Sequence, residues 1–304
     1  MTITVLVPDD YGMSALAGIE GLELLRFDAR EPLPPGGERA DVLIPGIMAQ
    51  RYTVALLDKL PNLKLVQLLS AGSEQWHGKL PEGVLLSICR GAHGGSTAEW
   101  VIGALLAIYR ELIEFEHTRQ QRRWHQHVTD TLQDKRILVV GAGDLGQQLK
   151  RRLETFDART TMVANHARDG VHGKEALPEL LPHHDAVVLM VPVTPATTGM
   201  VDAAFLARMA DNAILVNAAR GQVVDTDALL AELHKGRLRA ALDVTDPEPL
   251  PADHPLWTAP NLLLTPHVAG AVTGHRKRAY AIVAEDLARF AAGKEPENLV
   301  GGDY

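Results

Sequence analysis

Short apolar runs alternate with amphipathic stretches along the first part of the chain. The runs occupy residues 3–7, 41–45, 65–69 and 84–88. Runs this short, bounded by turn residues such as Pro8, are typical of buried strands. Residues 49–59, between two of the runs, have the pattern of a helix. Strands that alternate with helices predict a parallel sheet covered by helices on both faces.

A second series of the same kind begins at residue 136. Its candidate strands occupy residues 136–140, 160–164, 186–191, 213–217, 239–244 and 262–265. Candidate helices between them include residues 145–156 and 227–235, and a last helix pattern covers residues 273–292. The two halves therefore share one strand–helix rhythm, which predicts the α/β fold class.

A longer helix is predicted between the two series. Ser96 or Thr97 is suited to cap its start, because a glutamate follows three residues after Ser96 as in a capping box. Apolar residues then recur at helical spacing as far as Leu112. The polar and basic segment 118–133, which contains Trp124, is interpreted as a connector between domains.

Composition narrows the class of protein. The 304 residues include 30 Lys and Arg against 38 Asp and Glu, a net charge of −8, and a single cysteine, Cys89. Net negative charge disfavours nucleic-acid binding, and no apolar run approaches the roughly 18 residues that cross a bilayer. A lone cysteine fits a reducing compartment, and the histidines at 183 and 184 lack zinc-like spacing. We expect a cytoplasmic globular protein without nucleic-acid, membrane or metal partners.

A glycine-rich turn follows the strand at residues 136–140. The sequence Gly-Ala-Gly-Asp-Leu-Gly at 141–146 matches G-x-G-x-x-G and opens an amphipathic helix, which is the context that this motif requires. Gly141 permits the tight turn, Gly143 permits a pyrophosphate to approach the backbone, and Gly146 permits close helix packing. Amides at Asp144 and Leu145, at the start of the helix, are expected to help bind the phosphates of a dinucleotide.

The end of the next strand indicates which dinucleotide is bound. An acidic residue about twenty positions on would hold the ribose hydroxyls of NAD, but Asn165 stands there and Arg168 follows it. A neutral residue with a cation nearby accepts a 2′-phosphate that a carboxylate would repel. This favours NADP(H), with NAD(H) as the alternative cofactor and a solvated loop charge as the alternative interpretation of Arg168.

Three ionisable residues follow later predicted strands. Arg220 comes after the strand at 213–217, Glu248 lies in a proline-rich loop, and His267 comes just after the strand at 262–265. Ligands of open α/β sheets bind at the carboxyl ends of the strands. A guanidinium can clamp a carboxylate, a histidine can protonate a carbonyl, and a carboxylate can orient the histidine. The set predicts reduction of a 2-oxo acid.

These motifs together are similar to the D-isomer-specific 2-hydroxyacid dehydrogenase family. The matching segments, in the family's order and spacing, are 141–146, 191–194, 217–221, 242–249 and 264–270. The resemblance implies two Rossmann-like, doubly wound parallel-sheet domains, with the cofactor domain inserted into the substrate domain. Residues 1–98 and 272–304 are expected to form the substrate domain, and residues 99–271 the dinucleotide-binding domain.

The resemblance also implies roles for individual residues. Arg220 would clamp the substrate, His267 would act as the acid and base, and Glu248 would be its partner. The further implied contacts are the backbone amides of Ala71, Gly72 and Ser73 for the substrate carboxylate, and Pro192, Ala218 and Asp243 for the cofactor, with Asp243 near the nicotinamide carboxamide.

We expect an NADP(H)-linked reductase of small 2-oxo acids, such as glyoxylate or hydroxypyruvate. The resemblance implies that it is a homodimer. The alternative is an NAD(H)-sensing binding protein of the corepressor kind, because the same three catalytic residue types occur there on the same fold. A methyltransferase that used the glycine turn for another nucleotide would leave Arg220, Glu248 and His267 unexplained.

Overall fold

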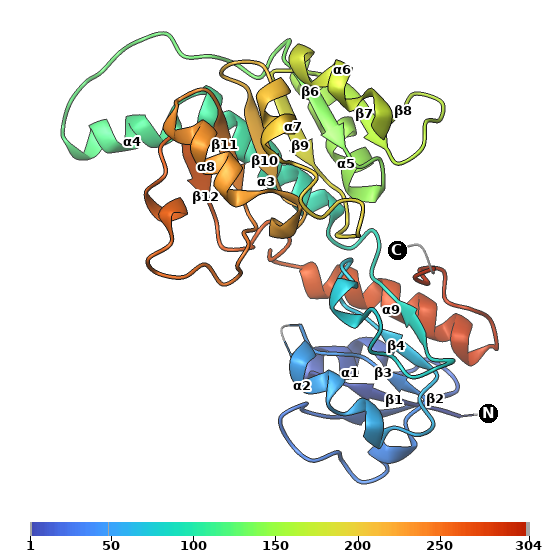
Figure 1. Ribbon diagram of the computed structural model, residues 1–304. Coiled ribbons are helices and arrows are strands. Elements are labelled where there is room, and N and C mark those ends of the chain that lie inside the picture. Colours follow the sequence, from blue (N-terminus) through green and yellow to red (C-terminus); the bar gives the residue numbers. More distant parts are fainter. Residues whose placement is uncertain (1, 48, 302–304) are drawn as a thin grey trace. The chain divides into compact units, whose positions relative to one another are not determined.

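The computed structural model describes residues 2–47 and 49–301 (Figure 1). The chain divides into two compact units. The first comprises the described residues of 1–93 and of 273–304, and the second comprises residues 94–272. Residues 1 and 302–304, at the ends of the predicted substrate domain, lie outside the described residues.

The first unit is built on a five-stranded parallel sheet in the order β2-β1-β3-β4-β5. Its elements are β1 Ile3–Val7, α1 Asp10–Leu16, β2 Leu22–Arg26, β3 Val42–Leu43, α2 Gln50–Val54, β4 Leu65–Gln67, β5 Leu85–Ser87 and α9 His275–Ala291. The sequence pattern did not indicate β2, because this edge strand is only partly buried and Glu23 interrupts its apolar residues.

The second unit contains a seven-stranded parallel sheet in the order β12-β11-β10-β9-β6-β7-β8. Its strands are β6 Arg136–Val140, β7 Arg159–Ala164, β8 His172–Gly173, β9 Ala186–Leu189, β10 Ile214–Asn217, β11 Arg239–Leu242 and β12 Leu262–Leu264. Its helices are α3 Gly94–Tyr109, α4 Leu112–Gln120, α5 Asp144–Leu153, α6 Leu177–Leu180, α7 Ala203–Arg208 and α8 Thr226–His234. Two parallel sheets with helices confirm the predicted α/β class.

Alternate residues of the strands of the second unit face opposite layers of helices. Ile137 and Val139 of β6 belong to the cluster that includes residues of α3 and α5. Leu138 and Val140 belong to the cluster that includes residues of α7 and α8. Because both faces are covered, these strands are continuous apolar runs rather than alternating ones, which explains why the sequence located them so well.

Helix α3 differs from its predicted form at both ends. It begins at Gly94, so Ser96 and Thr97 lie inside its first turn and do not cap it. A Cβ at Gly94 would collide with the carboxylate of Asp144 in α5. The start of α3 therefore packs closely against α5, and a larger residue at Gly94 would displace side chains of α5. The chain then breaks at Glu111, whose φ is +51°, before α4 begins.

The segment 118–133 is part of the second unit, so its interpretation as a connector between domains is wrong. Helix α4 ends at Gln120, and the following residues return to β6 without regular structure. Leu132 is buried in the same apolar cluster as residues of α3 and α5. This burial fixes the returning segment to the second unit.

Candidate active site

The glycine turn joins β6 to α5 at the carboxyl end of an interior strand of the sheet. Gly141 has a φ of +116°, and a Cβ there would collide with the carbonyl group of Met190. A Cβ at Gly146 would collide with the carbonyl oxygen of Gly141. By contrast, a Cβ at Gly143 would meet nothing within 4 Å. Two of the glycines are thus required by the fold, and the third leaves open space at the start of α5, where a pyrophosphate fits.

Arg168 is held at this glycine turn. Its Nη2 donates to the carbonyl oxygen of Ala142 at 2.9 Å, although the two residues lie far apart in the sequence. The exposed side chain of Asn165, just after β7, donates to the ring of His166 at 3.2 Å. Arg168 is therefore not merely a solvated loop charge, because the fold places a cation beside the proposed dinucleotide site.

Arg220 follows β10 in a loop that a buried side chain holds. Asn217 is fully buried, and its Nδ2 donates to the carbonyl oxygen of Arg220 at 2.8 Å. Its Oδ1 accepts from the amide of Ala219 at 3.0 Å. No role was predicted for Asn217, although a polar residue at the end of an apolar strand was a usable signal.

His267 and Glu248 form a direct pair. Nδ1 of His267 donates to Oε1 of Glu248 at 2.6 Å, and both side chains are about half exposed. His267 has a φ of +55°, an uncommon backbone conformation for a residue other than glycine. Among the described residues no hydrogen bond involves its Nε2. The ring is therefore fixed through one nitrogen and can reach a ligand with the other.

Asp243 fixes the loop that carries His267. Its carboxylate accepts from Oγ1 of Thr265 at 2.6 Å and from the amides of Val268 and Ala269 at 2.9 and 2.8 Å. The amide of His267 also donates to the carbonyl oxygen of Asp243 at 2.7 Å. These bonds explain why a carboxylate is 2% exposed at this position. Contact of Asp243 with the nicotinamide carboxamide stays a prediction.

The other residues predicted to bind the cofactor lie around the same edge of the sheet. Exposed Pro192 follows β9, and its carbonyl oxygen accepts from Oγ1 of Thr197 at 2.6 Å. Ala218 is buried directly after β10. Asp144 and Leu145 begin α5, with a carboxylate oxygen of Asp144 buried. No hydrogen bond within the described residues uses the amides of Asp144 and Leu145, as is usual at a helix start, so these amides are available to a ligand.

The predicted substrate-carboxylate loop belongs to the first unit, where it follows β4. The hydroxyl of Ser70 donates to the carbonyl oxygen of Gly72 at 2.9 Å, and the buried hydroxyl of Ser73 lies 3.1 Å from Nε2 of His77. Within the described residues, no hydrogen bond uses the amides of residues 71–73. A compact turn with unused amides is suited to an anion.

Residues 2–47 and 49–301 contain neither a metal-binding cluster nor a membrane-spanning helix. No group of three or more His, Cys, Asp or Glu in this part of the chain is placed to hold a metal ion. No helix in it has the length and apolar character needed to cross a membrane.

The glycine turn and the His–Glu pair on a doubly wound parallel sheet define a nicotinamide-dependent dehydrogenase. The sequence model described as "D-isomer specific 2-hydroxyacid dehydrogenase, NAD binding domain" matches residues 102–269. The glyoxylate reductase of Thermofilum pendens is 31% identical over 84% of this chain and 79% of its own length. The chain therefore belongs to the D-isomer specific 2-hydroxyacid dehydrogenase family, and it is an NAD(P)-dependent oxidoreductase.

Other relatives and solved structures are consistent with this family membership. The human glyoxylate reductase/hydroxypyruvate reductase is 29% identical over 94% of this chain and 92% of its own. A D-isomer specific 2-hydroxyacid dehydrogenase from Xanthobacter autotrophicus, solved with NADPH and MES, has a TM-score of 0.83 at 30% identity, covering 98% of both chains. An NADPH-dependent glyoxylate/hydroxypyruvate reductase from Sinorhizobium meliloti, solved with NADP and sulfate, has a TM-score of 0.82 at 26% identity, covering 99% of this chain and 98% of that one.

Proposed function

We propose that this chain is an NADPH-dependent reductase of small 2-oxo acids of the glyoxylate and hydroxypyruvate kind. The observation that carries the proposal is the 2.6 Å bond between Nδ1 of His267 and Oε1 of Glu248. This bond leaves Nε2 of an exposed ring available to a substrate. The relatives that act on glyoxylate and hydroxypyruvate, and the neighbours solved with NADPH or NADP, support the choice of substrate and cofactor.

The bound nicotinamide supplies the hydride that reduces the carbonyl carbon of the substrate. His267 donates a proton from Nε2 to the carbonyl oxygen as negative charge develops there. Glu248 holds the ring in one orientation and stabilises its protonated form. Arg220 is proposed to clamp the substrate carboxylate. The amides of Ala71, Gly72 and Ser73 are proposed, on the family resemblance, to bind a carboxylate.

The second unit is proposed as the dinucleotide-binding domain and the first as the substrate domain. The backbone at Gly141, Gly143 and residues 144–146 would bind the pyrophosphate. Asn165 and Arg168 would accept the 2′-phosphate of NADP(H), whose charge the guanidinium complements. The remaining proposed cofactor contacts are Pro192, Ala218 and Asp243.

The test is a spectrophotometric screen of NADPH and NADH oxidation with a panel of 2-oxo acids. We expect turnover of glyoxylate or hydroxypyruvate, with a higher kcat/KM for NADPH than for NADH. An absence of turnover with every acid and both cofactors would contradict the proposal and favour a dinucleotide-sensing protein.

A homodimer is proposed through the arm formed by residues 112–128 of the second unit. In this arm Trp124 and Val128 are 93% and 96% exposed, an unusual state for large apolar side chains. Nε2 of His127 lies 2.8 Å from Glu111, which fastens the arm at its base. Sedimentation should give twice the monomer mass, and Trp124→Ser with Val128→Ser should shift it toward the monomer. A monomeric wild type would refute the homodimer.

A cytoplasmic location is also proposed, because the single cysteine, Cys89, cannot form an intramolecular disulfide, as is typical of proteins from a reducing compartment. Fractionation of cells that produce the protein should find it with cytoplasmic markers.

A further inference from the structure

Two loops at the carboxyl edge of the sheet of the first unit are fastened together. The amide of Cys89, after β5, donates to the carbonyl oxygen of Ser70, after β4, at 2.9 Å. Nε2 of His93 donates to the carbonyl oxygen of Leu69 at 2.9 Å. These bonds place residues 89–93 directly beside the proposed substrate-carboxylate loop at residues 70–73.

Arg90 is the cation that this arrangement presents. Its side chain is exposed, and among the described residues no hydrogen bond or ion pair involves its guanidinium. The backbone on both sides is fixed, because Cys89 is buried and Gly91 has a φ of +95° that favours glycine. By contrast, Arg278 is engaged, because its Nε donates to the carbonyl oxygen of Ala92 at 2.9 Å.

Further cations lie at the start of α9. The bond from Arg278 to the 89–93 loop brings this turn to the same edge, and Arg276 and Lys277 are exposed in it, while the acidic Asp9 lies close to Tyr280 one turn further on. The whole chain has a net charge of −8, so this concentration of cations is local. Clustered charges of one sign raise the local concentration of a ligand of opposite charge.

We propose that Arg90 binds a second anionic group of the substrate, so that the preferred substrates are 2-oxo acids with a distal carboxylate or phosphate. This inference rests on the proposed function, because it takes residues 70–73 as the site of the first carboxylate. A guanidinium suits either anion, since its parallel N–H groups match carboxylate and phosphate oxygens alike. Glyoxylate has no distal group and leaves Arg90 unused.

The experiment compares kcat/KM for matched pairs of 2-oxo acids with NADPH. The pair that tests a distal carboxylate is 2-oxoglutarate with 2-oxohexanoate. The pair that tests a distal phosphate is 3-phosphohydroxypyruvate with hydroxypyruvate. We expect wild type to prefer the dianionic member of at least one pair. Arg90→Gln should lower that preference on the order of 10- to 100-fold, the worth of a charge-assisted hydrogen bond, mainly through KM.

The control is Arg39→Gln, an exposed arginine that precedes β3 and so lies at the opposite edge of the same sheet. It should keep the wild-type preference. The inference is overturned if wild type does not discriminate within either pair, or if Arg90→Gln keeps the preference. The pair in which Arg90→Gln lowers the preference identifies the anion as carboxylate or phosphate.

A calorimetric titration without cofactor separates this inference from the proposed function. D-malate should bind wild type more tightly than D-lactate does, and Arg90→Gln should remove the difference. If no 2-oxo acid is reduced but this binding difference is found, the proposed function fails and the Arg90 site stands. Equal binding of D-malate and D-lactate by wild type rejects a distal-carboxylate site, and equal binding of 3-phosphoglycerate and glycerate as well rejects the Arg90 site whatever the turnover.

Discussion

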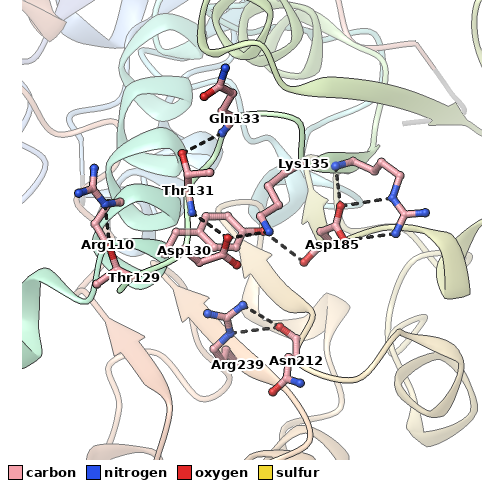
Figure 2. A network of polar contacts seen from close by, with 11 residues as sticks. Arg110, Thr129, Asp130, Thr131, Gln133, Lys135, Asp185, Asn212 and Arg239 are labelled. Carbon is pink, nitrogen blue, oxygen red and sulfur yellow. Dashed lines mark hydrogen bonds and ion pairs between the residues drawn. The ribbon is translucent and has the colours of Figure 1, made fainter. Parts of the chain in front are cut away.

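The two edges of the sheet of the second unit use the same kinds of residue in opposite ways. At the carboxyl edge, the His267–Glu248 pair is about half exposed, and Nε2 of His267 makes no hydrogen bond within the described residues. At the amino edge, charged side chains bind one another and the backbone (Figure 2). The carboxyl edge therefore presents a polar group to a ligand, whereas the amino edge uses its polar groups internally.

Ion pairs at the amino edge join the start of β6 to the residue before β9 and link residues of the segment that precedes β6. Asp185 accepts from the amide of Arg136 at 2.7 Å and from its guanidinium at 3.3 Å, and Lys135 binds Asp130 at 2.8 Å. The buried ring of Tyr109 lies 5.2 and 5.3 Å from the cationic groups of Lys135 and Arg239. Charge alone does not indicate a functional site; the bonding capacity that remains unused does.

The largest effect that this comparison predicts is at His267. His267→Ala should lower kcat by roughly two to four orders of magnitude, because the proton donor to the carbonyl oxygen is lost. Steady-state kinetics with the best 2-oxo acid measures the effect. His183→Ala, which removes an exposed histidine at the end of a short 3-10 helix, is the control and should behave as wild type. Near-normal turnover by the His267 variant would show that His267 is not the proton donor to the carbonyl oxygen.

The next effect concerns the glycine turn. Gly143→Ala should weaken NADPH binding by roughly 10- to 100-fold, because its methyl group occupies the open space where phosphate oxygens would meet the helix amides. The melting temperature should stay near that of wild type, since the added Cβ touches nothing in the protein. Gly103→Ala in α3, also into open space, is the control. Unchanged fluorescence titration of NADPH with the Gly143 variant would place the pyrophosphate elsewhere.

A smaller and more selective effect is expected at Arg168. Arg168→Ala should raise the Kd for NADPH by about tenfold and that for NADH much less, because only NADPH has a 2′-phosphate for the guanidinium to bind. Parallel titrations of the two cofactors measure the ratio. An equal loss of affinity for NADPH and NADH would show that Arg168 supports the glycine turn through its bond to Ala142 and does not bind the 2′-phosphate.

The smallest effect is predicted at the amino edge. Asp185→Ala should lower the free energy of unfolding by about 1 kcal/mol, since the amide and guanidinium of Arg136 lose their acceptor. Because this edge is opposite the proposed site, kcat and KM should not change. Denaturant unfolding and steady-state kinetics on one preparation test both statements. A changed kcat would show that the two edges are coupled.

Much of the fold was readable from the sequence, because strands buried on both faces give uninterrupted apolar runs. The runs that became β6 and β9–β11 are of this kind, whereas the two-residue β8 and the partly buried edge strand β2 left no such signal. Candidate chemistry was readable where a residue type is unusual after a strand, as with Arg220 and His267. Contacts between residues distant in the sequence, such as Arg168 with Ala142, were not readable, because no local pattern encodes them.

Residues that hold the loops of the candidate site were recognised in the sequence only in part. Asp243 was assigned to the cofactor, yet in the structure its carboxylate binds the loop that carries His267. Asn217 binds the Arg220 loop in a similar way. Both are buried polar residues at strand ends, where a side chain acts on the neighbouring loop through bonds that depend on three-dimensional register. Sequence marks such positions as unusual but does not show which loop they hold.

Helix α9 has a consequence for the order in which the chain can fold during synthesis. Its Tyr280, Val283 and Leu287 are buried in one apolar cluster with residues of β1 and α1, although nearly the whole chain separates them in sequence. The core of the first unit therefore stays incomplete until the ribosome has made α9, whereas residues 94–272 emerge as a continuous segment. The second unit can fold while the N-terminal strands still await their last helix.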